Sequence, residues 1–147
     1  MLAGCASVKY SPLATEQKSI PHVSVTVSYK IDGIYQLQVH NKLHRSIILE
    51  WNSSAYVNTG GDAVRLIHIQ DADSIPDEIP PNQMPTPVAS SAKLKTYFVG
   101  ESWIDYARRG VTPRPRDSEK KAKIYIAFNI NGKRVYWTAD VTFISVQ

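Results

Sequence analysis

The dipeptide Asn131-Gly132, between two strand-like segments, constrains the fold more than any other feature of this sequence. Both residues tolerate the positive φ angles that a type I′ turn requires, so the sequence predicts a β-hairpin with a two-residue loop. Ile130 then pairs with Lys133, and the apolar residues of both strands share one face. A single hairpin is marginally stable in water, so the remaining chain must supply a second apolar layer. The cross-strand apolar pairs are Phe128 with Val135, Ile126 with Trp137, and Ile124 with Ala139.

The composition favours one all-β domain. The chain has 147 residues, a length that suits a single core, and 43% of them are hydrophobic. Nine Pro and seven Gly indicate many turns and argue against a helical bundle. The single cysteine excludes an intramolecular disulfide and a zinc cluster of several thiolates. The net charge of +4 is compatible with an anionic membrane surface or with nucleic acid, but requires neither.

A second hairpin is predicted near the N-terminus. Residues 22–30 alternate between apolar and polar side chains, which is typical of a strand with one buried face. A two-residue loop at Asp32-Gly33 would place Leu37 opposite Ser28, apolar against polar. We therefore predict a three-residue loop with Gly33 in the left-handed conformation, next to a bulge. This register pairs Tyr29 with Tyr35, Val27 with Leu37, and Val25 with Val39.

Three further strands are predicted in the middle of the chain, over residues 46–51, 63–69 and 93–99. Residues 52–54 should end the first of these, and residues 55–58 should form a short edge strand. Ile47, Leu49 and Trp51 share one face of the first of these strands.

Two segments depart from the strand pattern. Residues 70–92 contain five prolines, which exclude a central strand there. Ser102 with Asp105 resembles a capping box, so residues 102–110 are predicted to form a short helix. A loop rich in Pro and Arg follows over residues 111–121.

Together these elements predict an all-β fold, an immunoglobulin-like β-sandwich of seven or eight strands with one short helical turn. The third-strand tryptophan, the helical connection and the terminal hairpin resemble immunoglobulin-like or fibronectin-like domains. The resemblance implies that Trp51 lies on strand C, and that residues 123–130 and 133–144 are strands F and G. We expect Trp51 and Trp137 to be largely buried, against opposite sheets. A resemblance in architecture implies no activity.

The residues Leu2-Ala3-Gly4-Cys5 resemble the lipobox of bacterial lipoproteins, in which the cysteine is acylated. The resemblance implies that residues 1–5 are the end of a signal peptide with its lipobox. It also implies that Cys5 carries a lipid anchor on the periplasmic face of the outer membrane, an address that Ala6 favours. Residues 6–21 lack periodicity and are predicted to be a flexible tether, followed by a single β-sandwich domain over residues 22–147. The alternative is that Cys5 is a buried or idle thiol.

No recognised catalytic or metal-binding constellation is present in the sequence. His40 and His44 are four residues apart, but neither carboxylates nor cysteines accompany them, and the same holds for His22 and His68. Ser102 lies in an incomplete nucleophile elbow and is better interpreted as a helix cap. We therefore predict no catalytic residue, no metal site and no cofactor.

The acidic run over residues 71–78 begins like a calcium loop. However, Pro76 stands where such a loop requires glycine. We interpret the run as a solvated loop, and weak calcium binding stays open.

The most strongly charged segment comprises residues 108–123. Seven basic and two acidic side chains give it a charge of +5. One interpretation is contact with anionic lipid headgroups, lipopolysaccharide or an acidic partner, and the other is a solvated loop partly balanced by the acidic run at residues 71–78. The candidate residues for binding an anionic surface are Arg108, Arg109, Arg114, Arg116, Lys120 and Lys121.

Two hypotheses about function follow. The first is a lipid-anchored envelope protein that acts as a non-catalytic binding or assembly module, and docks an envelope protein through a strand edge or a loop cluster. The second is an envelope hydrolase or hydrolase inhibitor that uses residues 70–92 and 111–121 at a cleft. Convergent titratable groups in a pocket would favour the second hypothesis. Neither hypothesis includes nucleic acid, and the sequence identifies no small-molecule substrate.

Overall fold

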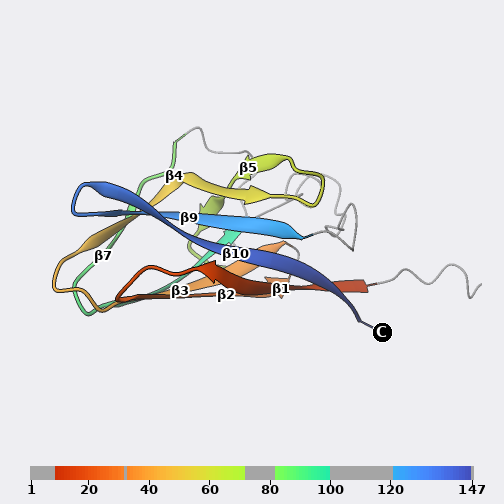
Figure 1. The fold of residues 1–147 in the computed structure, drawn as a ribbon, viewed down its shortest axis with the longest axis horizontal. Coiled ribbons are helices and arrows are strands. Elements are labelled where there is room, and N and C mark those ends of the chain that lie inside the picture. Colours follow the sequence, from red (N-terminus) through yellow and green to blue (C-terminus); the bar gives the residue numbers. More distant parts are fainter. Residues whose placement is uncertain (1–8, 32, 72–81, 100–120, 147) are drawn as a thin grey trace, which may run out of the picture.

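The computed structural model describes residues 9–31, 33–71, 82–99 and 121–146. These residues form ten β-strands and no helix, arranged as two antiparallel sheets that pack face to face (Figure 1). The predicted all-β sandwich is therefore confirmed, with ten strands in place of seven or eight. The predicted helix over residues 102–110 lies outside the described residues. The strands are β1 (Lys9–Lys18), β2 (Val23–Ile31), β3 (Ile34–Asn41), β4 (Ile47–Val57), β5 (Ala63–Arg65), β6 (Ile67–Ile69), β7 (Thr86–Val88), β8 (Lys93–Val99), β9 (Ala122–Ile130) and β10 (Lys133–Val146).

The order of the strands is that of an immunoglobulin-like sandwich. The four-stranded sheet has the order β2-β3-β8-β6, which corresponds to strands A, B, E and D. The six-stranded sheet has the order β1-β10-β9-β4-β5, in which β5, β4, β9 and β10 correspond to C′, C, F and G. Strand β7 also pairs with β4, so β1 and β7 are additions to the immunoglobulin-like pattern. Trp51 lies on the C-like strand, as predicted.

Both predicted hairpins are confirmed in register. Strands β9 and β10 pair from Lys133 with Ile130 to Val141 with Ala122 around the turn at Asn131-Gly132. Asn131 and Gly132 have φ angles of 54° and 81°, as a type I′ turn requires. Strands β2 and β3 pair Tyr29 with Tyr35, and a register shift follows on the turn side of this pair. Gly33 has a φ of 81°, the left-handed conformation that the three-residue loop demands.

Strand β4 is one long strand with a bulge, so the prediction that residues 52–54 end it is wrong. Its pairing with β9 shifts register between Glu50 and Ala55. The buried Ser54 side chain bridges this irregularity: its hydroxyl donates a hydrogen bond to the Glu50 carbonyl and accepts one from the Ala127 amide, both at 2.9 Å. Residues 55–57 then lie between β9 and β5, and they do not form an edge strand.

The segment predicted as one strand over residues 63–69 is divided between the two sheets. Strand β5 pairs with β4, and strand β6 pairs with β8 in the other sheet. Leu66 lies at the crossing point, fully buried, and its amide donates a hydrogen bond to the Ser54 carbonyl. A strand that changes sheets in this way keeps its hydrophobic pattern, and so the pattern alone does not reveal the division.

The flexible tether predicted over residues 6–21 is wrong for residues 9–18, which form β1. This strand pairs with the whole outer part of β10, from Lys9 opposite Val146 to Lys18 opposite Thr138. Backbone pairing covers an edge that β10 would otherwise leave open. Pro12 is compatible with this position, because β1 is itself an edge strand.

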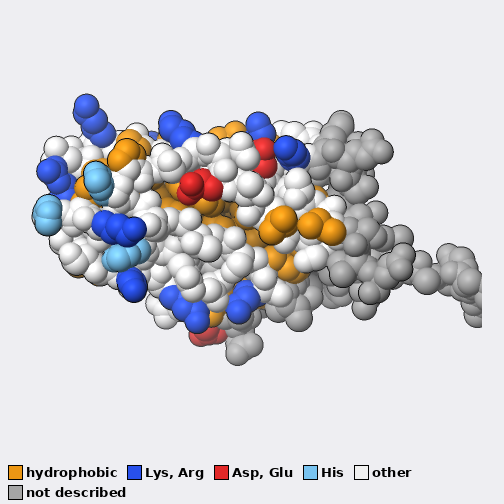
Figure 2. Space-filling model, turned by 60° about the horizontal axis from the view of Figure 1, so that its bottom comes forward, with side chains coloured by type: hydrophobic (Ala, Val, Ile, Leu, Met, Phe, Trp, Pro, Cys, Tyr) orange, Lys and Arg blue, Asp and Glu red, His pale blue; other side chains and the backbone are white. Residues whose placement is uncertain are grey.

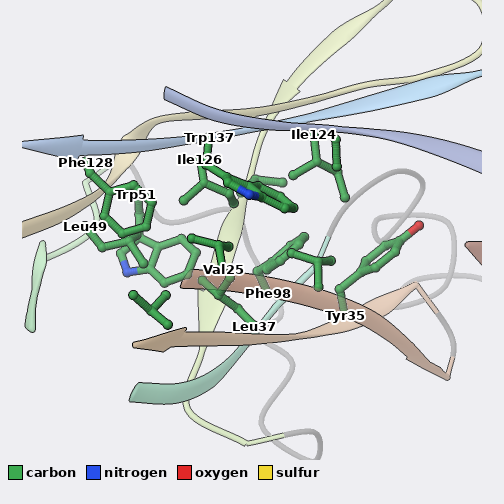
Figure 3. Close-up of a cluster of buried hydrophobic side chains, with 14 of the residues drawn as sticks. Val25, Tyr35, Leu37, Leu49, Trp51, Phe98, Ile124, Ile126, Phe128 and Trp137 are labelled. Atoms are coloured by element: carbon green, nitrogen blue, oxygen red, sulfur yellow. The ribbon is translucent and has the colours of Figure 1, made fainter. Parts of the chain in front are cut away.

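The hydrophobic core lies between the two sheets (Figure 3). Trp51 and Trp137 are 0% and 2% exposed, so the predicted burial of both is confirmed. They do not belong to opposite sheets, however: β4 and β10 are both strands of the six-stranded sheet, and both indoles face the four-stranded sheet. The opposing sheet contributes Val25, Tyr35, Leu37 and Phe98.

A second, smaller apolar cluster lies on the outer face of the four-stranded sheet. Its members alternate along the strands with the core residues, and they share rows because Ile34 pairs with Val99, and Val99 with Ile67. The cluster consists of Ile34, Ile67, Ile69 and Val99, all buried, with Tyr97 packed against them.

Candidate functional site

Most residues of the two predicted sites lie outside the described part of the chain. This applies to Cys5 and Ser102, to the acidic residues after Asp71, and to Arg108, Arg109, Arg114, Arg116 and Lys120. The predictions about them therefore stay predictions. Lys121 is described: its side chain is exposed and lies 3.6 Å from the carboxylate of Asp140.

The four histidines do not converge. His68 belongs to β6 in the sandwich interior, whereas His22, His40 and His44 lie toward one end of the molecule. Within the described residues, no group of three or more His, Cys, Asp or Glu side chains is placed to hold a metal ion. The same part of the chain contains no helix long and apolar enough to cross a membrane.

His68 is held by packing and hydrogen bonds in the interior. Its ring stacks on Trp51, and its Nε2 lies 2.7 Å from the Thr96 hydroxyl. Its backbone amide donates to the Gln83 side-chain oxygen at 2.6 Å, and the side-chain Nε2 of Gln83 donates to the Leu66 carbonyl. Burial lowers the pKa of His68, because a charged imidazole loses hydration there. These contacts give His68 a structural role in joining the sheets.

Asn41 fixes the loops at one end of the sandwich. Its side chain is fully buried, and its Nδ2 donates to the carbonyls of Arg45, Val88 and Ala89 at 2.8, 3.0 and 3.1 Å. Its Oδ1 accepts a hydrogen bond from the Leu43 amide. One amide therefore ties the β3–β4 loop to the segment after β7, and both loops are held in a defined position.

The β1–β2 turn lies against the same loops. The Lys42 amide donates to the His22 carbonyl at 2.9 Å, and the Ser90 hydroxyl donates to the Leu43 carbonyl at 2.7 Å. The β9–β10 turn lies at this end too, because β4 starts opposite the end of β9, with Ile48 paired to Asn129. Figure 1 shows these turns at the end of the sandwich opposite the start of β1. We call residues 18–22, 40–46, 89–93 and 130–133 the loop end.

The loop end contains the described non-glycine residues with positive φ. His22 and Ser91 both have a φ of 63°, and Asn131 has 54°. Asn131 suits its turn type, and histidine is enriched among non-glycine residues with positive φ, so Ser91 is the least usual of the three. The hydrogen bonds from Asn41 to the Val88 and Ala89 carbonyls hold the segment that contains Ser91.

The loop end is positively charged. Its segments contain no Asp or Glu, and among the described residues no ion pair joins its cations to a carboxylate. Figure 2 shows histidine, lysine and arginine side chains gathered at this end of the molecule. The charged and titratable side chains are Lys18, His22, His40, Lys42, His44, Arg45, Lys93 and Lys133.

A polar groove continues from the loop end onto the outer face of the four-stranded sheet. Its volume is about 350 Å³. The pairing of β2, β3 and β8 arranges its polar side chains in two rows across the strands. The rows are Ser24, His40 and Lys93, and then Thr26, Gln38 and Lys95. We call these six residues the donor face.

The outer faces of the two sheets differ in their charges. Strands β2, β3 and β8 contain lysine and histidine but no carboxylate. The six-stranded sheet carries charges of both signs, since Arg134 Nε lies 3.0 Å from Glu50 and Lys121 lies 3.6 Å from Asp140. A single sign of charge is therefore a property of the donor face and not of the whole surface.

Sequence analysis did not identify the donor face, because it depends on pairing between distant segments. His40 and Lys93 are neighbours only because β3 pairs with β8. The hydroxyl residues on the polar side of residues 24–28, and the alternation of Lys93 and Lys95, were visible in the sequence. The sequence pattern did not show that these two segments share one face of a sheet.

The described strands define an immunoglobulin-like β-sandwich with a basic loop end, a class that specifies architecture and leaves activity open. No family model matches the sequence. No curated protein matches it either. Among solved structures, a crystal structure of a protein from Archaeoglobus fulgidus has a TM-score of 0.34 and 11% sequence identity, covering 96% of this chain and 98% of that chain. A likeness at this level carries no argument about fold or function.

Proposed function

We propose that this protein is a non-catalytic binding or assembly module of the bacterial envelope, anchored in the outer membrane through a lipid on Cys5. The anchor is proposed from the resemblance of Leu2-Ala3-Gly4-Cys5 to a lipobox. The binding role is supported by one structural observation: a basic loop end, fixed by Asn41, at the end of the sandwich opposite the start of β1.

Strand β1 separates the proposed lipid attachment from the loop end. The strand has 10 residues, so its two ends are about 30 Å apart at 3.2–3.4 Å per residue. Cys5 precedes Lys9 by four residues, whereas the loop end begins at Lys18. A lipid on Cys5 would therefore attach the domain by one end, and the loop end would point away from that attachment toward a partner in the periplasm.

The anchor is tested by labelling with palmitate in cells that express the protein with its signal peptide. The expected result is a labelled protein in the membrane fraction, and an unlabelled, soluble Cys5→Ser variant. A single acyl chain binds membranes weakly, and so the several chains of a mature lipoprotein are needed for stable attachment. Labelling that persists in the Cys5→Ser variant would contradict the proposal.

The binding role is tested with a photoreactive residue at one of two positions. His44 is exposed at the loop end, and Ile144 is 50% exposed near the other end of the sandwich. We expect specific cross-links to an envelope component from position 44 and none from position 144. Cross-linking from position 144 alone would place the partner at the wrong end and overturn the proposed role of the loop end.

A further inference from the structure

The donor face has a regular spacing that follows from the geometry of a sheet. Neighbouring strands are about 5 Å apart, and side chains two residues apart on one strand are about 7 Å apart. Ser24, His40 and Lys93 occupy one row, and Thr26, Gln38 and Lys95 occupy the next. The result is a grid of polar groups across three strands that lines one groove.

The groups in this grid combine two kinds of recognition. The ammonium groups of Lys93 and Lys95 attract anions and form charge-assisted hydrogen bonds. The hydroxyls of Ser24 and Thr26 and the amide of Gln38 both donate and accept hydrogen bonds, which suits ligand hydroxyls. A ligand that satisfies the whole grid carries both anionic groups and many hydroxyls.

We propose that the donor face binds an anionic glycan, a sugar polymer that carries carboxylate, sulfate or phosphate groups. The basic loop end adjoins the groove at His40 and Lys93, and it extends the positive field along the polymer. This inference rests on the proposed function as a binding module, and it adds the site and the chemical class of the ligand.

Two other classes of anionic ligand fit the donor face less well. Single-stranded nucleic acid binds on aromatic side chains that stack with the bases, and the groove lining contains no aromatic residue other than His40. An acidic protein would need buried anchors such as Trp, Tyr or Arg at the centre of its interface. The grid contains only polar and cationic side chains, and the apolar residues that line the groove are Val39 and Leu94.

The test uses the whole chain as a soluble Cys5→Ser variant and measures binding by calorimetry. The probes are heparin and polygalacturonate as anionic glycans, dextran as a neutral glycan, and polyphosphate and oligo-dT as anions without a sugar-hydroxyl pattern. We expect binding to both anionic glycans and none to dextran. The affinity should fall as salt increases, because the ion pairs are exposed.

Two matched variants locate the site. Lys93→Gln with Lys95→Gln removes two charges from the donor face, and we expect a loss of about tenfold in affinity for the anionic glycans. Lys123→Gln with Arg134→Gln makes the same change of charge on β9 and β10 of the other sheet, where Arg134 is paired with Glu50. This control should change the affinity by less than about twofold. Equal losses in both variants would mean that total charge carries the binding, which would overturn the proposal.

A variant without a charge change separates glycan recognition from general attraction to anions. Gln38→Ala removes an exposed amide from the centre of the grid, and should weaken glycan binding severalfold while leaving polyphosphate binding unchanged. Urea unfolding checks that each variant remains folded. Absence of glycan binding by the folded wild-type protein at low salt, or binding of polyphosphate and oligo-dT as tightly as glycans, would overturn this inference. Palmitate labelling and the cross-links from position 44 would still decide the proposed function separately.

Discussion

The imidazole ring of His68 lies flat against the indole ring of Trp51, with 4.4 Å between the ring centroids and 8° between the ring planes. Trp51 comes from β4 in the six-stranded sheet, and His68 comes from β6 in the four-stranded sheet. The stack therefore joins the two sheets in the interior. Because burial lowers the pKa of His68, the neutral form of the ring is favoured in this position.

This burial predicts a stability that depends on pH. In the unfolded chain His68 takes up a proton near the ordinary histidine value of about 6.5, whereas the folded protein takes it up only at lower pH. The unfolded state then binds more protons, and so the free energy of unfolding decreases as the pH falls below about 6.5. His68→Phe keeps a ring against Trp51 and removes the titration. We expect the wild type to lose stability relative to this variant between about pH 7 and pH 5 in urea unfolding. A difference that stays constant over that range would contradict the expectation.

The two buried tryptophans predict large effects on stability. Trp51→Ala and Trp137→Ala each remove a fully buried indole, and should lower the free energy of unfolding by about 3–5 kcal/mol. Met84 is 85% exposed, and Met84→Ala should change it by less than about 0.5 kcal/mol. Urea unfolding followed by circular dichroism measures all three. An unchanged midpoint for Trp51→Ala would mean that the sandwich interior is not arranged as described.

The sequence predicted what short-range patterns determine. The Asn131-Gly132 turn and the alternation of residues 22–30 each specified a hairpin and its register, because a turn type and an apolar face fix the pairing locally. The burial of Trp51 followed from the same alternation in the third strand. These features depend on residues close together in the chain, and a pattern can report them without knowledge of the rest of the fold.

Pairing between distant segments was the part that the sequence did not reveal. Strand β1 is polar and contains Pro12, and it exists because the edge of β10, more than a hundred residues away, is available. The bulge at Ser54 depends on the amide of Ala127 on β9. The division at Leu66 depends on which sheet each half of the segment meets. The donor face requires β3 to lie beside β8, so it too depends on pairing between distant segments.

The amide of Asn41 predicts a coupling between stability and loop order. Asn41→Ala leaves the carbonyls of Arg45, Val88 and Ala89 without this donor. A buried polar group without a partner costs about 1–3 kcal/mol, so we expect a loss of about 2–4 kcal/mol in the free energy of unfolding. The amide of Leu43, which donates to Asn41 Oδ1, should also exchange faster with solvent.

A second asparagine supplies the control for Asn41. Asn58 Oδ1 accepts hydrogen bonds from the amides of Gly60 and Asp62 in an exposed turn. Asn58→Ala should cost less than about 1 kcal/mol and leave the exchange of the Leu43 amide unchanged. Equal losses of stability in the two variants would show that burial of the Asn41 amide is not what matters.

Arg114 and Arg116 lie outside the described residues, so their role as contacts to an anionic surface is a prediction from the sequence. Each basic residue near such a surface contributes about 1 kcal/mol, and salt screens the attraction within about 8–10 Å. Reversing both residues to Glu should abolish binding of the unacylated protein to anionic vesicles at low salt. Lys30→Glu with Lys123→Glu is the control, because it makes the same change of charge at two exposed positions outside the loop end and the donor face. Equal binding of the wild type to neutral vesicles would remove the basis for this prediction.

The hydrogen bond between Glu16 and Trp137 tests whether β1 belongs to the folded domain. The indole Nε1 of Trp137 donates to the Glu16 carboxylate at 2.6 Å, from the core strand β10 to the edge strand β1. Glu16→Ala leaves this partly buried donor without its acceptor, and should cost about 1–3 kcal/mol. Glu16→Gln keeps an acceptor oxygen, and so we expect it to recover part of that loss. Gln17→Ala, at the exposed neighbouring position, should be close to neutral. Urea unfolding followed by tryptophan fluorescence reports both the stability and the surroundings of the indole. If Glu16→Ala and Gln17→Ala behaved alike, β1 would not contribute to the stability of the sandwich, and residues 9–18 would act as the flexible tether that their composition suggests.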